Sequence, residues 1–337
     1  MYILGIESSC DETSAAVLSV DENGHKVLSN IVASQIETHR LYGGVVPEIA
    51  SRAHIEAISS ITYEAISEAG ITIKDIGCIA VTSHPGLIGA LLVGVNFAKS
   101  LAFANNIPLV PVNHVKAHVA AAYLEYPELK APFSALVVSG GHTSFYDVVS
   151  PTDFVEIGGT RDDAAGEAFD KIGRVIGMPY PAGAAMDKLA YEGDPLSVKL
   201  PSPALIGDNA DFSFSGLKTA ALNYINSERQ KGSEPNAADI TASYTKVIVD
   251  AIVKKTDYII KKYSPKQLVL AGGVAANSHI RAALEDLCKK RNVTFCRPSL
   301  ALCSDNAAMV AAAGYYEYLN GNFADTSLNA SANDDGT

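Results

Sequence analysis

Two histidines stand four residues apart, at positions 114 and 118. The residues around them predict a helix over about 113–124, and side chains at this spacing lie on one face of a helix, a single turn apart. Two imidazoles so placed can chelate one metal ion, although separate surface or core histidines give the same pattern. The predicted strand 108–112 leads directly into this helix. Its end favours a ligand site, because open α/β sheets bind ligands there.

A third ligand is predicted at Asp305, which opens the expected last helix (304–320) beside another strand end. The alternative is that Ser304 or Asp305 only caps free N–H groups at the start of that helix. Two histidines and one carboxylate would leave coordination positions open for water or substrate, and they suit Fe(II) or Zn(II).

Two glycine pairs follow predicted strands. In the turn 139–143, Gly140 and Gly141 would let backbone N–H groups face an anion, although a plain hairpin turn also explains them. In the segment 268–277 a buried strand, a double glycine and a helix start follow one another. A nucleoside could lie against that turn with Asn277 bound to its ribose or base, or the glycines could serve tight packing alone.

Acidic side chains mark two further turns. Asp11 and Glu12 lie in the first turn of the chain, where they could hold a cation or accept a proton, or form a solvated acidic turn. Asp170 and Asp187 flank a turn with Pro and Gly, and such acids could bind ribose hydroxyls. Alternatively, Asp170 forms a surface charge pair with Lys171.

Composition narrows the class of protein. The chain has 337 residues, 48% of them hydrophobic, which is enough for two domains. No window is apolar enough to predict a membrane span, and no secretion signal is expected. The five cysteines include no C-x-x-C pair, which favours a reducing cytosol. The formal net charge of −11 argues against binding nucleic acid without a local basic face or a partner.

The order of predicted elements repeats. Three strands followed by alternating helices and strands occur twice, which indicates an internal duplication. This order matches the α/β actin-like (ASKHA) plan of two ribonuclease-H-like lobes with a nucleotide cleft between them. The expected parts are a first lobe, a second lobe with an insertion and a last helix that could pack back toward the first lobe, and a flexible tail: 1–130, 131–322, about 177–215 and 323–337.

Six segments together resemble one family. They are LGIESSCDETS, NHVKAHVAAA, VVSGGHT, GEAFDKIG, LAGGVAAN and CSDNAAM, and in this order they are similar to the TsaD family of bacterial tRNA N6-adenosine threonylcarbamoyltransferases over nearly the whole chain. The resemblance implies a transferase that moves threonylcarbamoyl from threonylcarbamoyl-AMP to N6 of the adenosine beside the anticodon. The tRNAs read codons that begin with A, and the products are t6A and AMP.

The resemblance also implies site residues and partners. The metal, expected as one Fe(II) per subunit with Zn(II) as the alternative, would be held by His114, His118 and Asp305. The partners would be tRNA, a smaller TsaB-like paralogue and a TsaE-like ATPase, in the cytoplasm and without a membrane. The implied substrate-binding residues are Val137, Val138, Ser139, Gly140, Gly141, Asp170, Gly183, Asp187 and Asn277.

In the expected reaction the metal and the acids Asp11 and Glu12 would have separate roles. The metal would orient and polarise the carbamoyl carbonyl, and Asp11 or Glu12 would accept the amine proton or position the tRNA. Rival functions are an actin-like small-molecule kinase or ATPase, and a silent scaffold that only binds a partner. A metalloprotease is disfavoured, because Val115 stands where H-E-x-x-H needs its glutamate.

Overall fold

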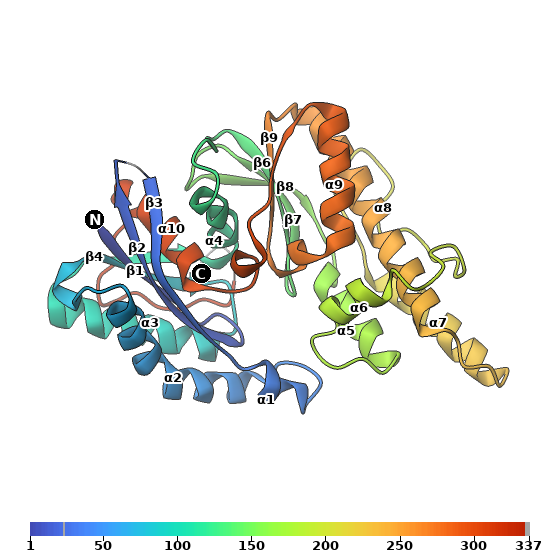
Figure 1. The fold of residues 1–337 in the computed structure, drawn as a ribbon, viewed down its shortest axis with the longest axis horizontal. Coiled ribbons are helices and arrows are strands. Elements are labelled where there is room, and N and C mark those ends of the chain that lie inside the picture. Colours follow the sequence, from blue (N-terminus) through green and yellow to red (C-terminus); the bar gives the residue numbers. More distant parts are fainter. Residues whose placement is uncertain (23, 334–337) are drawn as a thin grey trace. The chain divides into compact units, whose positions relative to one another are not determined.

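The computed structural model describes residues 1–22 and 24–333, and its contacts divide the chain into two compact units. Unit 1 comprises Met1–Ala131, Val149–Phe154 and Pro298–Thr337, and unit 2 comprises Pro132–Val148 and Val155–Arg297. Each unit contains a five-stranded sheet with helices packed on it (Figure 1).

The sheet of unit 1 has the strand order β3-β2-β1-β4-β5. The first three strands are antiparallel, whereas β4 and β5 run parallel to β1. Parallel strands need a crossover, and helices supply it between β3 and β4 and between β4 and β5. The strands are β1 (Tyr2–Glu7), β2 (Glu12–Asp21), β3 (Gly24–Ser34), β4 (Ile76–His84) and β5 (Leu109–Asn113), and the helices of this part are α1 (Ile36–Arg40), α2 (Pro47–Glu68), α3 (Ile88–Asn105) and α4 (His114–Ala120).

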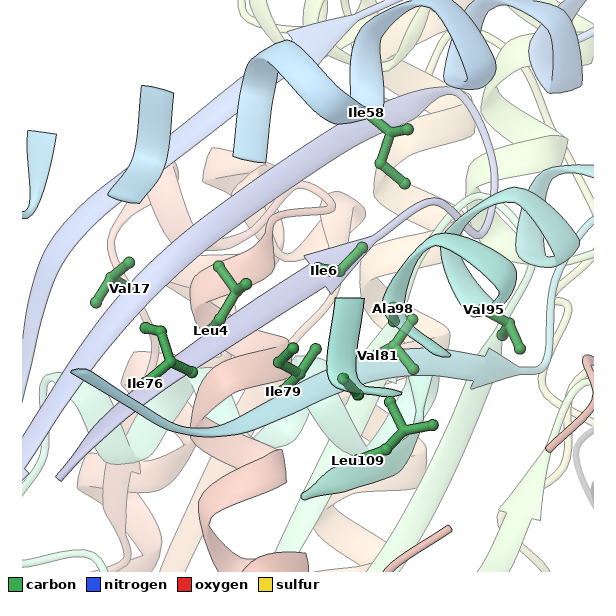
Figure 2. Close-up of a cluster of buried hydrophobic side chains, with 11 residues drawn as sticks. Leu4, Ile6, Val17, Ile58, Ile76, Ile79, Val81, Val95, Ala98 and Leu109 are labelled. Atoms are coloured by element: carbon green, nitrogen blue, oxygen red, sulfur yellow. The ribbon is translucent and has the colours of Figure 1, made fainter. Parts of the chain in front are cut away.

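The core of unit 1 lies on the face of the sheet covered by α2 and α3. Leu4 and Ile6 of β1 pack there with Ile58 of α2 and Val95 of α3 (Figure 2). By length and composition alone, α3 is the one helix in the described part of the chain that could cross a membrane. One face of this helix packs in the core through Val95, Ala98 and Ala102.

The other face of the sheet is covered by α10 (Ala307–Leu319), which approaches β1 very closely. A Cβ added to Gly5 would lie 2.2 Å from the carbonyl oxygen of Ala307, so only glycine allows this contact. The close approach fixes the start of α10, and therefore the position of Asp305, against the strand that ends at Glu7.

Unit 2 repeats the topology of unit 1. Its strand order is β10-β9-β6-β7-β8, in which β6 and β7 are antiparallel and β9 runs parallel to both β6 and β10. The predicted duplication is therefore confirmed. The elements are β6 (Phe133–Val138), β7 (Thr143–Val148), β8 (Phe154–Gly159), α5 (Ala165–Val175), α6 (Gly183–Leu189), α7 (Ser215–Gln230), α8 (Ala237–Tyr263), β9 (Gln267–Ala271), α9 (Ser278–Arg291) and β10 (Thr294–Cys296).

Two boundaries differ from the sequence expectation. Unit 2 ends at Arg297 and not at residue 322, because α10 packs on the sheet of unit 1 through its small residues. The expectation that the last helix could pack back toward the first lobe therefore agrees with the structure. The last helix begins at Ala307, and its cap is Asn306, which accepts a hydrogen bond from the Met309 N–H. Capping by Ser304 or Asp305 is therefore wrong. The expected insertion, 177–215, contains α6 and a loop in which Ala204 bridges Phe212.

The expectation of a flexible tail over 323–337 is wrong for most of its described part. The Ala324 N–H donates to Leu109 of the edge strand β5, and the Ser331 N–H donates to Ser83 at the end of β4. Between them, Leu328 and Ala330 pack against the core of unit 1. The polar composition of the segment suggested disorder, although Leu328 and Ala330 are apolar and pack against this core. Residues 334–337 lie outside the described residues.

Deletion of residues 324–337 should lower the free energy of unfolding by about 2 kcal/mol. The deletion exposes apolar surface of Leu328 and its neighbours, and it uncovers part of the β5 edge. Chemical denaturation of the two proteins measures the difference. Leu328→Ala should reproduce part of it, and equal stability of the truncated and full chains would contradict a structural role for the tail.

Candidate functional site

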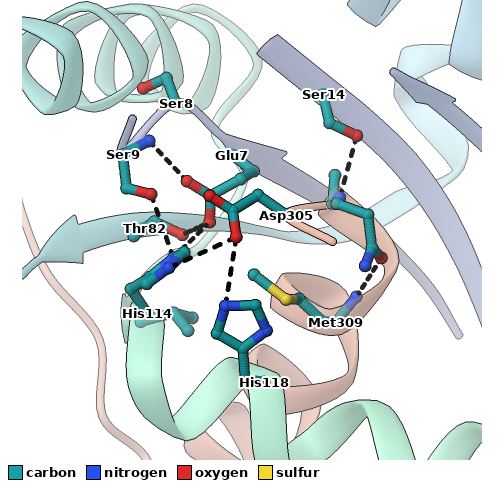
Figure 3. A network of polar contacts seen from close by, with 12 residues as sticks. Glu7, Ser8, Ser9, Ser14, Thr82, His114, His118, Asp305 and Met309 are labelled. Carbon is teal, nitrogen blue, oxygen red and sulfur yellow. Dashed lines mark hydrogen bonds and ion pairs between the residues drawn. The ribbon is translucent and has the colours of Figure 1, made fainter. Parts of the chain in front are cut away.

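The predicted histidine pair lies at the start of α4, directly after β5. Asn113 caps this helix by accepting a hydrogen bond from the Lys116 N–H, so the helix begins with His114. Both histidines are buried, and their ring centroids are 4.7 Å apart. Asp305 reaches them from the segment before α10 (Figure 3). The structure thus brings all three predicted ligands together within unit 1.

The spacing of the three side chains fits a shared metal ion. The Oδ1 atom of Asp305 lies 3.6 Å from Nε2 of His114 and 3.1 Å from Nε2 of His118, and the three ligand atoms lie within 4.8 Å of one another. Ligands bound at about 2.1 Å to one metal are separated by roughly 3.0–3.4 Å.

The hydrogen bonding of His118 also favours a metal. The pair His118–Asp305 is close enough for an ion pair but lacks hydrogen-bond geometry, and neither ring nitrogen of His118 has a hydrogen-bond partner among the described residues. A buried polar atom without a partner is costly and therefore rare. A metal ion bound through Nε2 would remove that cost for one of the two nitrogens.

A buried acid that the sequence analysis missed contacts the Nδ1 atom of His114. Glu7, at the end of β1, is 0% exposed and lies 3.2 Å from Nδ1 of His114. It also accepts hydrogen bonds from the Ser9 N–H and the Thr82 hydroxyl, and the Ser9 hydroxyl is 3.1 Å from the same Nδ1 (Figure 3). A carboxylate can only accept, so the Nδ1 of His114 carries the proton and Nε2 is left for a metal.

Glu7 and His114 each favour the charged form of the other. Burial raises the pKa of Glu7, but the neighbouring His114 outweighs burial and lowers it below its ordinary value. Burial lowers the pKa of His114, but Asp305 and Glu7 outweigh it and raise the pKa. The signal in the sequence was a glutamate that ends an otherwise apolar strand, YILGIE.

The predicted acids Asp11 and Glu12 lie where β2 begins. Burial, Asp305 and Asp11 together raise the pKa of Glu12 to about 10, and a hydrogen bond links its side chain to that of Asp11. Without a cation, Glu12 therefore keeps its proton at neutral pH. The carboxyl groups of Asp11, Glu12 and Asp305 lie near one another, and a bound cation would stabilise such an arrangement.

A second missed residue, His54 of α2, holds the turn that carries these acids. Its Nε2 is 3.0 Å from the carbonyl oxygen of Cys10, and its Nδ1 is 2.8 Å from the hydroxyl of Thr13. A carbonyl only accepts, so Nε2 donates to Cys10. Burial lowers the pKa of His54, which keeps the ring neutral. The histidine thereby fixes both ends of the turn.

The double glycine after β6 is required neither by backbone conformation nor by close packing. Gly140 and Gly141 do not have positive φ angles, and a Cβ on either would meet nothing within 4 Å. Their backbone is therefore open to an approaching ligand. Gly272 differs, because its φ is +94° and its Cβ would lie 2.4 Å from the Val138 carbonyl. The packing explanation holds for that glycine.

The remaining predicted substrate residues meet at the carboxyl ends of β6 and β9, within unit 2. Asp170 accepts a hydrogen bond from the Ala182 N–H, next to Gly183 at the start of α6. Asp187 accepts from the N–H and hydroxyl of Ser278, the first residue of α9.

The other residues of this group also lie at the carboxyl ends of β6 and β9. Asn277 caps α9, Val137 and Val138 end β6, and the Ser139 N–H donates to His142. Lys171 pairs with Asp163 and Glu167, so the alternative of an Asp170–Lys171 pair is wrong.

Comparison with known proteins identifies close relatives. The family model TsaD, described as tRNA N6-adenosine threonylcarbamoyltransferase, matches residues 26–312. Proteins of that name from Clostridium botulinum (strain 657 / Type Ba4) and Geobacillus kaustophilus are each 51% identical over 331 residues. These alignments cover 98% of this chain and 96% and 95% of theirs.

Two solved structures share the fold. Component A of the Acidaminococcus fermentans (R)-2-hydroxyglutaryl-CoA dehydratase has a TM-score of 0.56 at 16% identity and covers 95% of this chain and 98% of its own. HypF from T. kodakarensis has a TM-score of 0.63 at 14% identity, over 97% of this chain and 48% of its own. The likeness confirms the two-lobed actin-like α/β fold and says nothing further of function.

Proposed function

Because the chain belongs to the tRNA N6-adenosine threonylcarbamoyltransferase family and is a transferase, we propose the reaction that it catalyses. It transfers threonylcarbamoyl from threonylcarbamoyl-AMP to N6 of the adenosine beside the anticodon, in tRNAs that read codons beginning with A. The amine nitrogen forms a bond to the carbamoyl carbon, the bond from that carbon to the phosphate oxygen breaks, and AMP leaves. The observation that carries the proposal is the buried cluster of His114, His118 and Asp305.

These three residues would hold one Fe(II) per subunit, with Zn(II) as the alternative. The support is the ligand spacing, the unpartnered nitrogens of His118 and the fixed proton on Nδ1 of His114. When bound, the metal supplies Lewis acidity toward an oxygen of the threonylcarbamoyl group. Glu7 holds the ring of His114, and the burial of the cluster limits access of water.

The adenylate would be bound by unit 2. The open backbone at Gly140 and Gly141 suits an anionic group, since N–H groups that are not crowded by side chains can face a phosphate. Asp170, Asp187 and Asn277 bring polar side chains to the same edge of the sheet, next to Gly183, where they suit hydroxyl groups and a base. Threonylcarbamoyl-AMP offers both kinds of group.

Asp11 is the residue we assign to accept the amine proton. An aromatic amine is a weak nucleophile, so a base near the reacting nitrogen is useful. Burial, Asp305 and Asp11 raise the pKa of Glu12 to about 10, so Glu12 already holds a proton and cannot accept another, and the assignment falls on its neighbour Asp11.

Asp11→Asn should therefore lower kcat at least tenfold at neutral pH, whereas Glu12→Gln, which keeps a donor, should lower it less. Single-turnover rates with preformed adenylate measure both. Equal losses, or a larger loss for Glu12→Gln, would contradict this division of roles.

The partners we propose are a smaller TsaB-like paralogue and a TsaE-like ATPase, in the cytoplasm where tRNA is modified. One support is the acidic charge of the chain, which is unfavourable for binding tRNA without help. Another is the exposed face of α2, where Ile55 and Tyr63 are 65% and 76% exposed. Apolar side chains of this size are often covered by a partner.

The decisive experiment measures transfer of labelled threonylcarbamoyl from its adenylate to an unmodified tRNA transcript. The purified chain with the two partners should form labelled t6A, and a strong chelator should stop the reaction until metal is restored. Hydrolysis of ATP by the chain alone, with no transfer to tRNA, would instead favour the small-molecule kinase or ATPase.

A further inference from the structure

The charges of the chain are divided unequally between the two units. Unit 1 has seven Lys and Arg against 19 Asp and Glu, whereas unit 2 has 19 against 18. The whole excess of negative charge thus belongs to unit 1. A polyanion would be repelled by unit 1 and could approach unit 2, provided that the basic residues of unit 2 are gathered in one place.

Six of these basic residues lie together at the end of the unit 2 sheet where strands β9 and β10 begin. The helices α8 and α9 end beside each other, where the neighbouring parallel strands β9 and β10 begin (Figure 1). The Thr294 N–H donates to the Lys266 carbonyl, which ties the two connections together. We name this surface the basic edge, and it consists of Lys261, Lys262, Lys266, Lys289, Lys290 and Arg291.

The acids near the basic edge do not neutralise it. Asp257 is shared, because Lys261 and Arg291 each lie 2.6 Å from one of its oxygens. Lys289 pairs with Glu285. Lys266 and Lys290 have no ion pair among the described residues, and both are exposed. The remaining surface is positive.

Aromatic rings hold one of these charges at the surface. The Lys262 ammonium lies 5.3 Å and 5.5 Å from the ring centroids of Tyr258 and Tyr263, and it donates to the Tyr258 hydroxyl. Such contacts restrict a long side chain without neutralising it, so less entropy is lost when it meets a phosphate.

The ordinary explanation for these residues is incomplete. Lys and Arg in the last turn of a helix interact favourably with the helix dipole, and five of the six occupy that place. Lys266 lies outside any helix, and the dipole accounts neither for the meeting of two such helix ends nor for the tyrosines around Lys262.

We propose that the basic edge binds the phosphate backbone of the tRNA substrate, an inference that rests on the proposed function. The length of α9 separates this edge from the glycine turns at the opposite end of the sheet by about 20 Å. At about 3.4 Å per nucleotide step, that distance corresponds to roughly six nucleotides. A tRNA that meets the adenylate bound at the glycine turns can therefore reach the basic edge with its stem.

The test reverses the three least neutralised charges, in the variant Lys262→Glu, Lys266→Glu and Lys290→Glu. The affinity of the full chain with its partners for an unmodified tRNA transcript is measured over a series of KCl concentrations. The Kd should rise at least tenfold, and the slope of log affinity against log salt should fall by about 2 to 3, since each lost phosphate contact removes roughly 0.9. The KM for tRNA should rise, and the KM for the adenylate should not.

Two further variants make the result specific. Lys26→Glu, Lys74→Glu and Lys199→Glu produce the same change in net charge at exposed positions elsewhere, and they should alter the salt slope much less. The charge-conserving variant Lys262→Arg, Lys266→Arg and Lys290→Arg should bind tRNA as the wild type does, because it keeps the positive charge at the same three positions.

An unchanged salt slope in the first variant would overturn the proposal, and so would an equal change in the control. Loss of binding to anionic phosphatidylserine vesicles without loss of tRNA binding would also overturn it, and would point to a membrane. Failure of the wild-type chain to form t6A would count against the proposed function alone, because tRNA affinity is measured without turnover.

Discussion

His118→Ala should reduce transfer from preformed adenylate by at least about 10³-fold, equivalent to roughly 4 kcal/mol of transition-state stabilisation. His118 is buried, its Nε2 faces Asp305 without forming a hydrogen bond, and its Nδ1 has no hydrogen-bond partner among the described residues, which favours a role as a metal ligand. His114→Ala should have a similar effect. Both variants should also purify with less metal, as determined by elemental analysis.

The matched control is His25→Ala. His25 is another partly buried histidine of unit 1, but it packs against Tyr315 and Tyr316. Its replacement should cost some stability and leave metal content and turnover within about twofold. A His118→Ala protein that turns over at the wild-type rate would remove the metal from the reaction, whatever the family relationship.

The topology could be predicted because it is encoded locally. Apolar runs such as YILGIE, the glycine and asparagine turns, and Pro47 at the start of a helix each act over a few residues. Repetition of the same order of elements then indicated the duplication. The sequence also allowed the last helix to pack back toward the first lobe, but it did not place the unit boundary at residue 297, because the boundary depends on Gly5, which lets α10 pack on a strand some 300 residues earlier in the chain.

The site was predictable to the extent that its residues have a local pattern. His114 and His118 share one helix face, and Asp305 was placed by the end of a strand and the start of a helix. Glu7 offers only the weak signal of a glutamate at the end of an apolar strand, and His54 offers none, because each contacts a residue more than 40 positions away. Their burial and their partners exist only in the folded chain.

Glu7→Gln should weaken metal binding about 10- to 100-fold without unfolding the protein. Glu7 accepts from three donors, namely the Ser9 N–H, the Thr82 hydroxyl and Nδ1 of His114. An amide has one oxygen, so its NH2 group must face at least one of these donors. Loss of the negative charge also makes His114 a less basic ligand, and partners of this kind typically contribute 10- to 100-fold to metal affinity.

Competition with a chromophoric chelator measures the affinity, and activity at rising metal concentration separates two causes of any loss. If Glu7 only positions His114, saturating metal should restore most of the turnover to Glu7→Gln, whereas it should not restore His118→Ala. Thr82→Val, which removes one hydrogen bond to Glu7 but keeps its charge, should lie between Glu7→Gln and the wild type. Wild-type affinity in Glu7→Gln would mean that the metal does not depend on the proton held at Nδ1. The fixed tautomer of His114, and with it the case for a preformed site, would then fail.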